Sequence, residues 1–90
     1  MIVRHFATIR DLTGESERRV EPAPATLAEL LESLARTYGG GFRGAVFDGA
    51  ALSAAVMVLV NGHNVRFTGG LDTPLGDDDE VSLFPPVGGG

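Results

Sequence analysis

The sequence predicts an α+β fold in which a mixed, curved sheet packs on one main helix. Residues 26–38 carry the apolar stripe of an amphipathic helix, and residues 55–60 form an apolar, β-branched run of the kind found in sheets. The segments near the two ends of the chain, residues 2–7 and 80–84, also have the composition of strands. Ninety residues, of which 43% are hydrophobic, suit a single small domain with one core.

The predicted helix is marked at both ends. Thr26 and Glu29 stand at the capping-box spacing, which satisfies exposed N–H groups of a first helical turn. A run of glycines at residues 39–41 ends the segment. Apolar residues recur at helical spacing on one face, which predicts that this face packs into the core: Leu27, Leu30, Leu31, Leu34 and Tyr38.

The first part of the chain predicts a strand, a loop and a second strand. Residues 2–7 form the first strand, residues 8–14 a loop or a single helical turn, and residues 18–22 a polar second strand that ends at its proline. The two strands are expected to pair as a hairpin. The buried face of the first strand stays open, because Arg4 shares a face with Phe6.

The segment after the helix is less regular. Residues 42–53 are rich in glycine and alanine and predict a mostly irregular connection that packs Phe42 or Phe47 under the sheet. Residues 55–60 predict a central strand buried on both faces or nearly so, because the run is continuously apolar.

The last part of the chain completes the sheet. The Asn61-Gly62 dipeptide tolerates positive φ and predicts a tight hairpin turn, with residues 65–67 as the short return strand. Residues 71–79 predict a loop with one helical turn, and residues 80–84 the last strand. Two hairpin-like halves around one helix are typical of the β-grasp, or ubiquitin-like, fold, although other small α+β domains use the same elements.

The C-terminal segment is built as a thin extension. Pro85 and Pro86 cannot donate to a sheet and hold φ near the polyproline value, so they end the last strand and direct the chain away from the domain. Gly88, Gly89 and Gly90 have no side chains, so this segment can be drawn into a narrow tunnel.

We therefore predict a β-grasp domain over residues 1–84 and a flexible glycine-rich tail over residues 85–90. The carboxylate of Gly90 is the candidate reactive group, because it is the last chemical group of that tail. A frayed end without a function is the alternative, since chain termini are often disordered.

The composition narrows the chemistry. Cysteine is absent, which excludes disulfides, thiolate metal sites and a cysteine nucleophile, so any sulfur must come from elsewhere. No segment has the apolar length of a signal peptide or a membrane span, and we expect a soluble cytoplasmic protein that acts away from membranes. The net charge of −5 argues against nucleic-acid binding and favours a partner with a basic surface.

All seven basic residues are arginine. The absence of lysine would prevent an activated C-terminus from acylating side chains of its own protein. A genome biased toward arginine, alanine and glycine would produce the same absence.

No catalytic or metal-binding group stands out. A hydroxyl nucleophile needs an adjacent base, and the two imidazoles, His5 and His63, lie in no motif that places one beside a serine. The acids at residues 77–80 lack the spacing of a calcium loop and predict a solvated turn that pairs with a basic rim on a partner. We therefore predict no catalytic side chain, metal site or bound cofactor in this chain.

Three segments resemble the MoaD/ThiS family of ubiquitin-like sulfur carriers, most closely its MoaD-like branch: residues 6–14, 58–62 and 75–90. The most specific part is the tetrapeptide Phe84-Pro85-Pro86-Val87 followed by the terminal Gly89-Gly90. Two positions depart from the family pattern. Gly88 stands where such tails often carry a small side chain, and Asp78 where the acidic turn more usually has glycine.

The resemblance implies a carrier whose Gly90 is adenylated by an ATP-using enzyme of the ubiquitin-activating type and then converted to a thiocarboxylate with sulfur from a donor protein. In MoaD-like members the sulfur goes to a pterin, and the chain would be the small subunit of molybdopterin synthase beside a large subunit. Residues 64–71 also resemble relatives that supply cysteine synthesis and archaeal members that double as protein modifiers. A modifier, a carrier for cysteine, thiamine or tRNA thiolation, and a plain interaction domain stay open as alternatives.

A partner-binding surface is expected beside the tail, because a buried aromatic is the usual anchor of such an interface. Phe84 has an alternative place in the core. The expected surface comprises Phe67, Phe84, Pro85, Pro86 and Val87.

Overall fold

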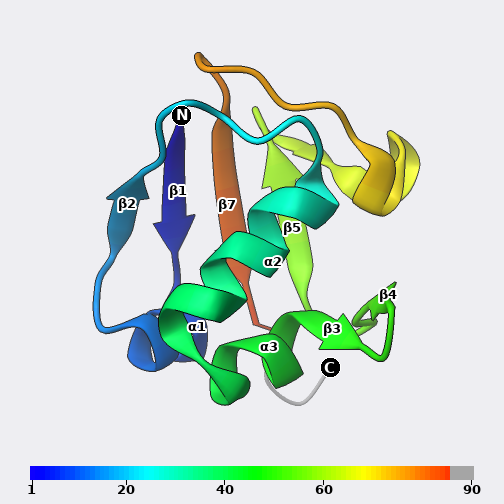
Figure 1. The fold of residues 1–90 in the computed structure, drawn as a ribbon. Coiled ribbons are helices and arrows are strands. Elements are labelled where there is room, and N and C mark those ends of the chain that lie inside the picture. The colour runs from blue at the N-terminus through cyan, green and yellow to red at the C-terminus, as the bar shows by residue number, and fades with distance from the viewer. Residues whose placement is uncertain (86–90) are drawn as a thin grey trace.

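The computed structural model describes residues 1–85, so most of the predicted tail, residues 86–90, lies outside the described residues. Five strands form one mixed sheet in the order β2-β1-β7-β5-β6. The central β7 is parallel to β1 and antiparallel to β5, and the two outer pairs are antiparallel (Figure 1). This is the predicted β-grasp arrangement. The strands are β1 (Ile2–His5), β2 (Glu17–Arg19), β5 (Met57–Val60), β6 (His63–Asn64) and β7 (Glu80–Phe84).

One long helix, α2 (Leu27–Tyr38), crosses a single face of the sheet (Figure 1). It begins as predicted: the Thr26 hydroxyl accepts a hydrogen bond from the Glu29 N–H at 3.3 Å, and the Glu29 carboxylate accepts one from the Ala25 N–H at 3.0 Å. The predicted leucine stripe is buried, whereas Tyr38 is half-buried at its end. None of the helices within residues 1–85 is long and apolar enough to cross a membrane.

The core lies between α2 and the sheet. Val3 and His5 point into it from β1, which settles the face that the sequence left open. Val81 and Leu83 of β7 do the same, while the residues that alternate with them along the strand are exposed or half-buried: Glu80, Ser82 and Phe84. Because of this alternation, the side chains on the opposite face of the sheet do not pack into the core.

The segment after α2 differs from the irregular connection that was predicted. Gly39, with φ of 96°, breaks α2, but a second helix, α3 (Gly40–Val46), starts at once. Phe42 and Val46 stand four residues apart and are both fully buried, so they give this glycine-rich segment a helical apolar face. A small hairpin of β3 (Phe47–Asp48) and β4 (Ala51–Leu52) follows, and Phe47 is buried as well.

Two predictions about the second hairpin were wrong. β5 is not central, because β7 takes that place, and it is buried on one face only, since Met57 is 37% exposed. The return strand is β6, not residues 65–67, because the two-residue turn pairs Val60 directly with His63. Asn61 and Gly62 do adopt the predicted positive φ, 51° and 84°.

Short helical turns replace several predicted strand and loop residues. The loop at residues 8–14 is largely a two-turn helix, α1 (Ala7–Thr13), which shortens the first strand, and the second strand ends before residue 20. The Asn64 side chain accepts a hydrogen bond from the Arg66 N–H at 3.0 Å and so starts the 3-10 turn η1 (Val65–Phe67). A further turn, η2 (Gly70–Asp72), lies at the start of the predicted loop.

Candidate functional site

The end of β7 fixes the point where the tail begins. Met57 of β5 pairs with Phe84 on one side, and on the other the Phe6 N–H donates to the Leu83 carbonyl oxygen at 3.1 Å. A strand bonded on both sides has little freedom at its end. The sheet therefore delivers Pro85 at a defined position and in a defined direction.

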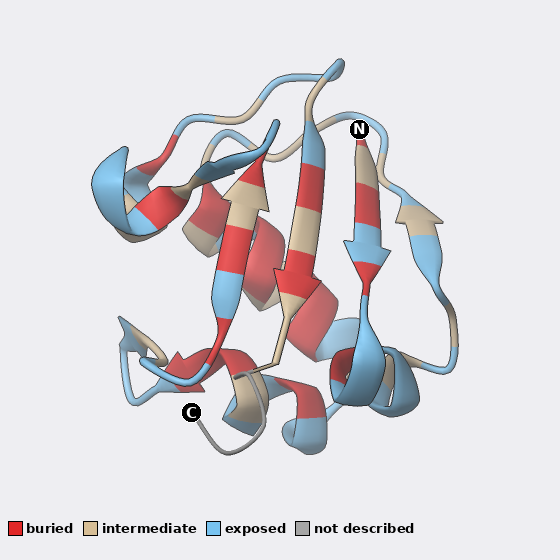
Figure 2. Ribbon diagram, turned by 180° about the vertical axis from the view of Figure 1, so that it is seen from behind, coloured by how far each residue is buried: buried red, intermediate tan, exposed pale blue. Residues whose placement is uncertain are grey.

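An apolar patch lies beside this point, on the face of the sheet that α2 does not cover. Figure 2 shows that face from behind, with no helix over the strands. The rings of Phe6 and Phe84 are stacked, with centroids 4.3 Å apart and planes 7° apart. We call the four side chains at this end of the face the open-face patch: Phe6, Met57, Leu59 and Phe84.

The patch is accessible to a partner. Phe6 is 38% and Met57 37% exposed, and Leu59 and Phe84 are half-buried. Polar side chains border the patch on the same face: Arg4 lies level with Leu59, since both pair with Ser82, and it forms an ion pair with Glu80 with 2.8 Å between Nη2 and Oε1. Exposed apolar side chains gathered in this way are the usual core of a protein–protein interface.

The structure brings together some of the predicted partner-binding residues and separates another. Phe84 lies in the open-face patch, which favours its surface role over the core, and Pro85 follows it, half-buried. Phe67 is 87% exposed but lies on η1, after the edge strand β6 and two strands away from β7. The remaining predicted residues lie outside the described residues: Pro86, Val87, Gly88, Gly89 and Gly90.

Sequence reasoning missed three members of the patch. Met57 and Leu59 were hidden in a run that is apolar at every position, so the run alone did not tell which face meets solvent. Phe6 was placed on the same strand face as Arg4, and that exposed charge was the available signal that this face is not the core.

The acidic turn lies at the opposite end of β7 from the tail (Figure 1). Its carboxylates close the surrounding loops: Asp77 accepts from the Ala23 N–H at 2.8 Å, and Asp79 accepts from the Gly76 N–H and the Asn61 side-chain amide, each at 2.8 Å. No three metal-ligating side chains gather within residues 1–85. Asp77 and Asp79 therefore support the fold, and contact with a basic rim on a partner stays a prediction.

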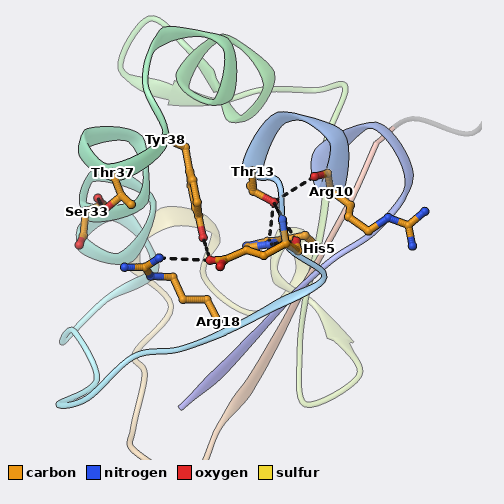
Figure 3. Close-up of polar contacts among 8 residues, drawn as sticks. His5, Arg10, Thr13, Arg18, Ser33, Thr37 and Tyr38 are labelled. Carbon is orange, nitrogen blue, oxygen red and sulfur yellow. Dashed lines mark hydrogen bonds and ion pairs between the residues drawn. The ribbon is translucent and has the colours of Figure 1, made fainter.

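A polar network joins α1, β2 and α2 on the side of the molecule shown in Figure 3. The Tyr38 hydroxyl donates to the Glu15 carboxylate, which Arg18 also reaches at 3.1 Å. Nδ1 of buried His5 lies 2.9 Å from the Glu15 carbonyl oxygen and 3.1 Å from the Thr13 hydroxyl. The imidazole of His5 also packs edge-on against the ring of Tyr38, with ring centroids 5.6 Å apart.

Proton affinities in this network follow from its contacts. Burial, together with the adjacent Glu15 carboxylate, raises the pKa of Tyr38 to about 12. Hydrogen bonds from Tyr38 and Arg18 lower the pKa of Glu15. At neutral pH the network therefore holds a neutral phenol against an ionised carboxylate, which is a stable arrangement and not a poised acid–base pair.

Comparison with known proteins decides the family. The model of the ThiS family matches residues 3–90. The chain belongs to this family. This ThiS-family protein is 39% identical over 90 residues to small archaeal modifier protein 3 of Haloferax volcanii, covering 98% of the chain and 96% of that relative. It is 34% identical over 88 residues to the molybdopterin synthase sulfur carrier subunit of Escherichia coli, covering 98% and 96%.

Solved structures agree with the fold of this ThiS-family protein. It superposes on a chain of the Amycolatopsis orientalis BexX/CysO complex with a TM-score of 0.83 and 30% identity, covering 99% of this chain and 98% of that one. The β-grasp fold and membership among sulfur carriers and ubiquitin-like modifiers are thereby shown.

Proposed function

We propose that the protein is a sulfur carrier whose terminal glycine, Gly90, is adenylated and then converted to a thiocarboxylate. The observation that carries the proposal is the family match, which runs to residue 90 and so includes the glycine tail. A terminal carboxylate has a pKa of about 3.5 and is ionised at neutral pH, so it attacks the α-phosphate of ATP as a nucleophile. ATP is used by the activating partner, and the carrier itself needs no bound cofactor.

The chemistry after activation requires a second protein. The acyl-adenylate makes the Gly90 carbonyl open to attack, and the attacking sulfur comes from a donor because this chain has no cysteine. When the donor supplies sulfur at the level of sulfide, a carbon–sulfur bond forms, the carbon–oxygen bond to the phosphate breaks, and AMP and a proton leave. A donor that presents the sulfur as a persulfide also needs a thiol to reduce the remaining sulfur–sulfur bond. The carrier contributes the carbonyl group and the surface that partners recognise.

The open-face patch is the proposed docking surface for these partners. It adjoins Pro85, so an enzyme that covers the patch also receives the start of the tail. Phe6 and Phe84 stack on each other before any partner arrives, which reduces the conformational entropy lost on binding. Pro86 and Val87 are expected to extend the contact into the partner.

We propose molybdopterin synthesis as the destination of the sulfur, with this chain as the small subunit of molybdopterin synthase in the cytoplasm. The Phe84-Pro85-Pro86-Val87 segment and the similarity to the Escherichia coli subunit support it. A second candidate is a protein modifier joined through Gly90 to lysines of other proteins. The 39% identity to the Haloferax volcanii modifier favours that role.

Mass spectrometry of the protein isolated from its own cells separates these candidates. A carrier shows the mass change of one oxygen replaced by sulfur at Gly90, and a modifier also shows Gly90 in isopeptide linkage to lysines of other proteins. Deleting the gene tests the destination: loss of molybdenum-enzyme activity, restored by the intact gene and not by one lacking the Gly90 codon, is the expected result. An unmodified terminus under all growth conditions would contradict both roles.

A further inference from the structure

We propose that this protein is protected against acylation by its own activated form, so that every acceptor of the activated Gly90 is a different kind of molecule. The inference rests on the proposed function and concerns its acceptors. An acyl-adenylate or thioester at Gly90 transfers to an amine with loss of AMP or thiol, formation of a carbon–nitrogen bond and release of a proton. If the protein had exposed lysines, the activated Gly90 of one copy could acylate a lysine of a neighbouring copy.

The sequence removes the usual acceptors. It contains no lysine and no cysteine, and its seven basic side chains are all arginine. The guanidinium group keeps its proton at any physiological pH and does not act as a nucleophile. Serine and threonine hydroxyls are weak nucleophiles without an adjacent base.

The structure also restricts the N-terminal amine and the single phenol. Met1 is 3% exposed, and its amine donates to the Val20 carbonyl oxygen at 3.2 Å. It also lies at the start of β1, whereas the tail begins at the far end of the parallel β7. The single phenol, that of Tyr38, donates a hydrogen bond to the Glu15 carboxylate. The Arg18 guanidinium lies over the Tyr38 ring, 5.7 Å from its centroid.

Arginine geometry explains only part of the missing lysine. Arg43 contacts both carboxylate oxygens of Glu32 through two nitrogens, at 3.1 and 2.6 Å, and lysine, which has a single side-chain nitrogen, cannot reproduce this bidentate contact. Arg10 and Arg36 differ, because their side chains make no ion pair or hydrogen bond within residues 1–85, and Arg10 points outward in Figure 3. Lysine would serve the fold equally well at these two positions.

The two positions therefore supply matched variants, Arg10→Lys and Arg36→Lys. Each adds one exposed amine and leaves the net charge and the tail unchanged. The wild type and both variants are prepared with a chemically made thioester at Gly90, which bypasses the adenylating enzyme. They are incubated at about pH 9, where a few per cent of lysine amines, with a pKa of about 10.4, are deprotonated.

Intact mass and denaturing gels measure amide-linked dimers. We expect dimers from the two lysine variants and only thioester hydrolysis from the wild type. As a control, a free lysine derivative is added to the wild-type thioester, and its capture shows that this thioester is reactive. Dimers from the wild type at the level of the variants would overturn the proposal, and an acetylated Met1 sample then identifies the amine. Lysine variants that form no dimer would also overturn it, because the missing lysine would then have no protective effect.

This test is independent of the cellular result. Absence of a thiocarboxylate in cells would contradict the proposed function and leave the chemical assay interpretable. Self-linked wild-type protein in the chemical assay would contradict protection and leave sulfur transfer intact.

Discussion

Phe6 and Phe84 come from opposite ends of the chain, and their rings stack with centroids 4.3 Å apart at the point where β7 ends and the tail begins. Parallel pairing of β1 with β7 places them there, since the register that joins His5 to Leu83 continues by one residue. Each ring covers the other only partly, and Phe6 stays 38% exposed. The pair is therefore both the end of the sheet and the centre of the open-face patch.

Truncating Phe6 should weaken binding of the adenylating enzyme more than truncating Phe67. Phe6→Ser removes an aromatic anchor beside the tail, and hot-spot aromatics contribute about 2 kcal/mol or more to such interfaces. Phe67→Ser removes a more exposed ring two strands away from β7. Calorimetric titration of both folded variants with the cognate enzyme measures the difference, and the reverse order of affinities would place the docking surface at the β6 edge.

Thr26→Ala and Leu30→Ala should lower stability without changing the reactive end. Loss of the cap on α2 should cost about 1 kcal/mol. Removal of the fully buried Leu30 side chain should cost about 2–5 kcal/mol. Denaturant unfolding gives both values, and a Leu30→Ala midpoint equal to that of the wild type would show that this face of α2 is not in the core.

Two glycine substitutions test α3. Gly39 has φ of 96°, so Gly39→Ala should destabilise the protein by about 1 kcal/mol. Gly44 lies inside α3 with open space around its Cα, so Gly44→Ala should stabilise the helix by about 0.5–1 kcal/mol. Opposite shifts of the unfolding midpoint are expected. Destabilisation by both substitutions would argue that residues 40–46 are not helical.

The Tyr38 phenol should titrate near pH 12, which the ultraviolet absorbance of tyrosinate reports directly because this is the one tyrosine in the sequence. Its folded pKa lies above the unfolded value of about 10, so the stability that it contributes is present below pH 10 and is lost as pH rises toward 12. Glu15→Gln should lower the midpoint of the Tyr38 titration, while the part of the pKa increase that burial causes should remain. A wild-type midpoint near 10 would contradict the Tyr38–Glu15 hydrogen bond.

The sequence predicted those parts of the fold that depend on local patterns. The leucine stripe and the Thr26 cap define α2, the Asn61-Gly62 pair defines a hairpin turn, and the tail motif indicated the family. These signals are read from neighbouring residues, because helical spacing, capping and turn chemistry act over only a few positions.

Features that depend on tertiary contacts were not predicted. α3 forms from a glycine-rich segment because the side chains of Phe42 and Val46 are buried in the core. This packing outweighs the low helix propensity of the glycines. The return strand moved to β6 because the turn sets its register and the Asn64 side chain starts a helical turn. To predict the open-face patch, one must know which face of β1 and β5 is covered, and only the position of α2 decides that.

Mass spectrometry of a reconstituted reaction detects sulfur transfer to Gly90. The protein, its cognate adenylating enzyme, ATP and a sulfur donor are combined, and the intact carrier is weighed. The full chain should exchange one terminal oxygen for sulfur, whereas a chain lacking Gly90, or one extended by a single residue, should remain unmodified and keep the same fold, because the carboxylate would no longer meet the ATP α-phosphate. Sulfur on the variant without Gly90, or none on the intact protein, would contradict a sulfur-carrier role for Gly90.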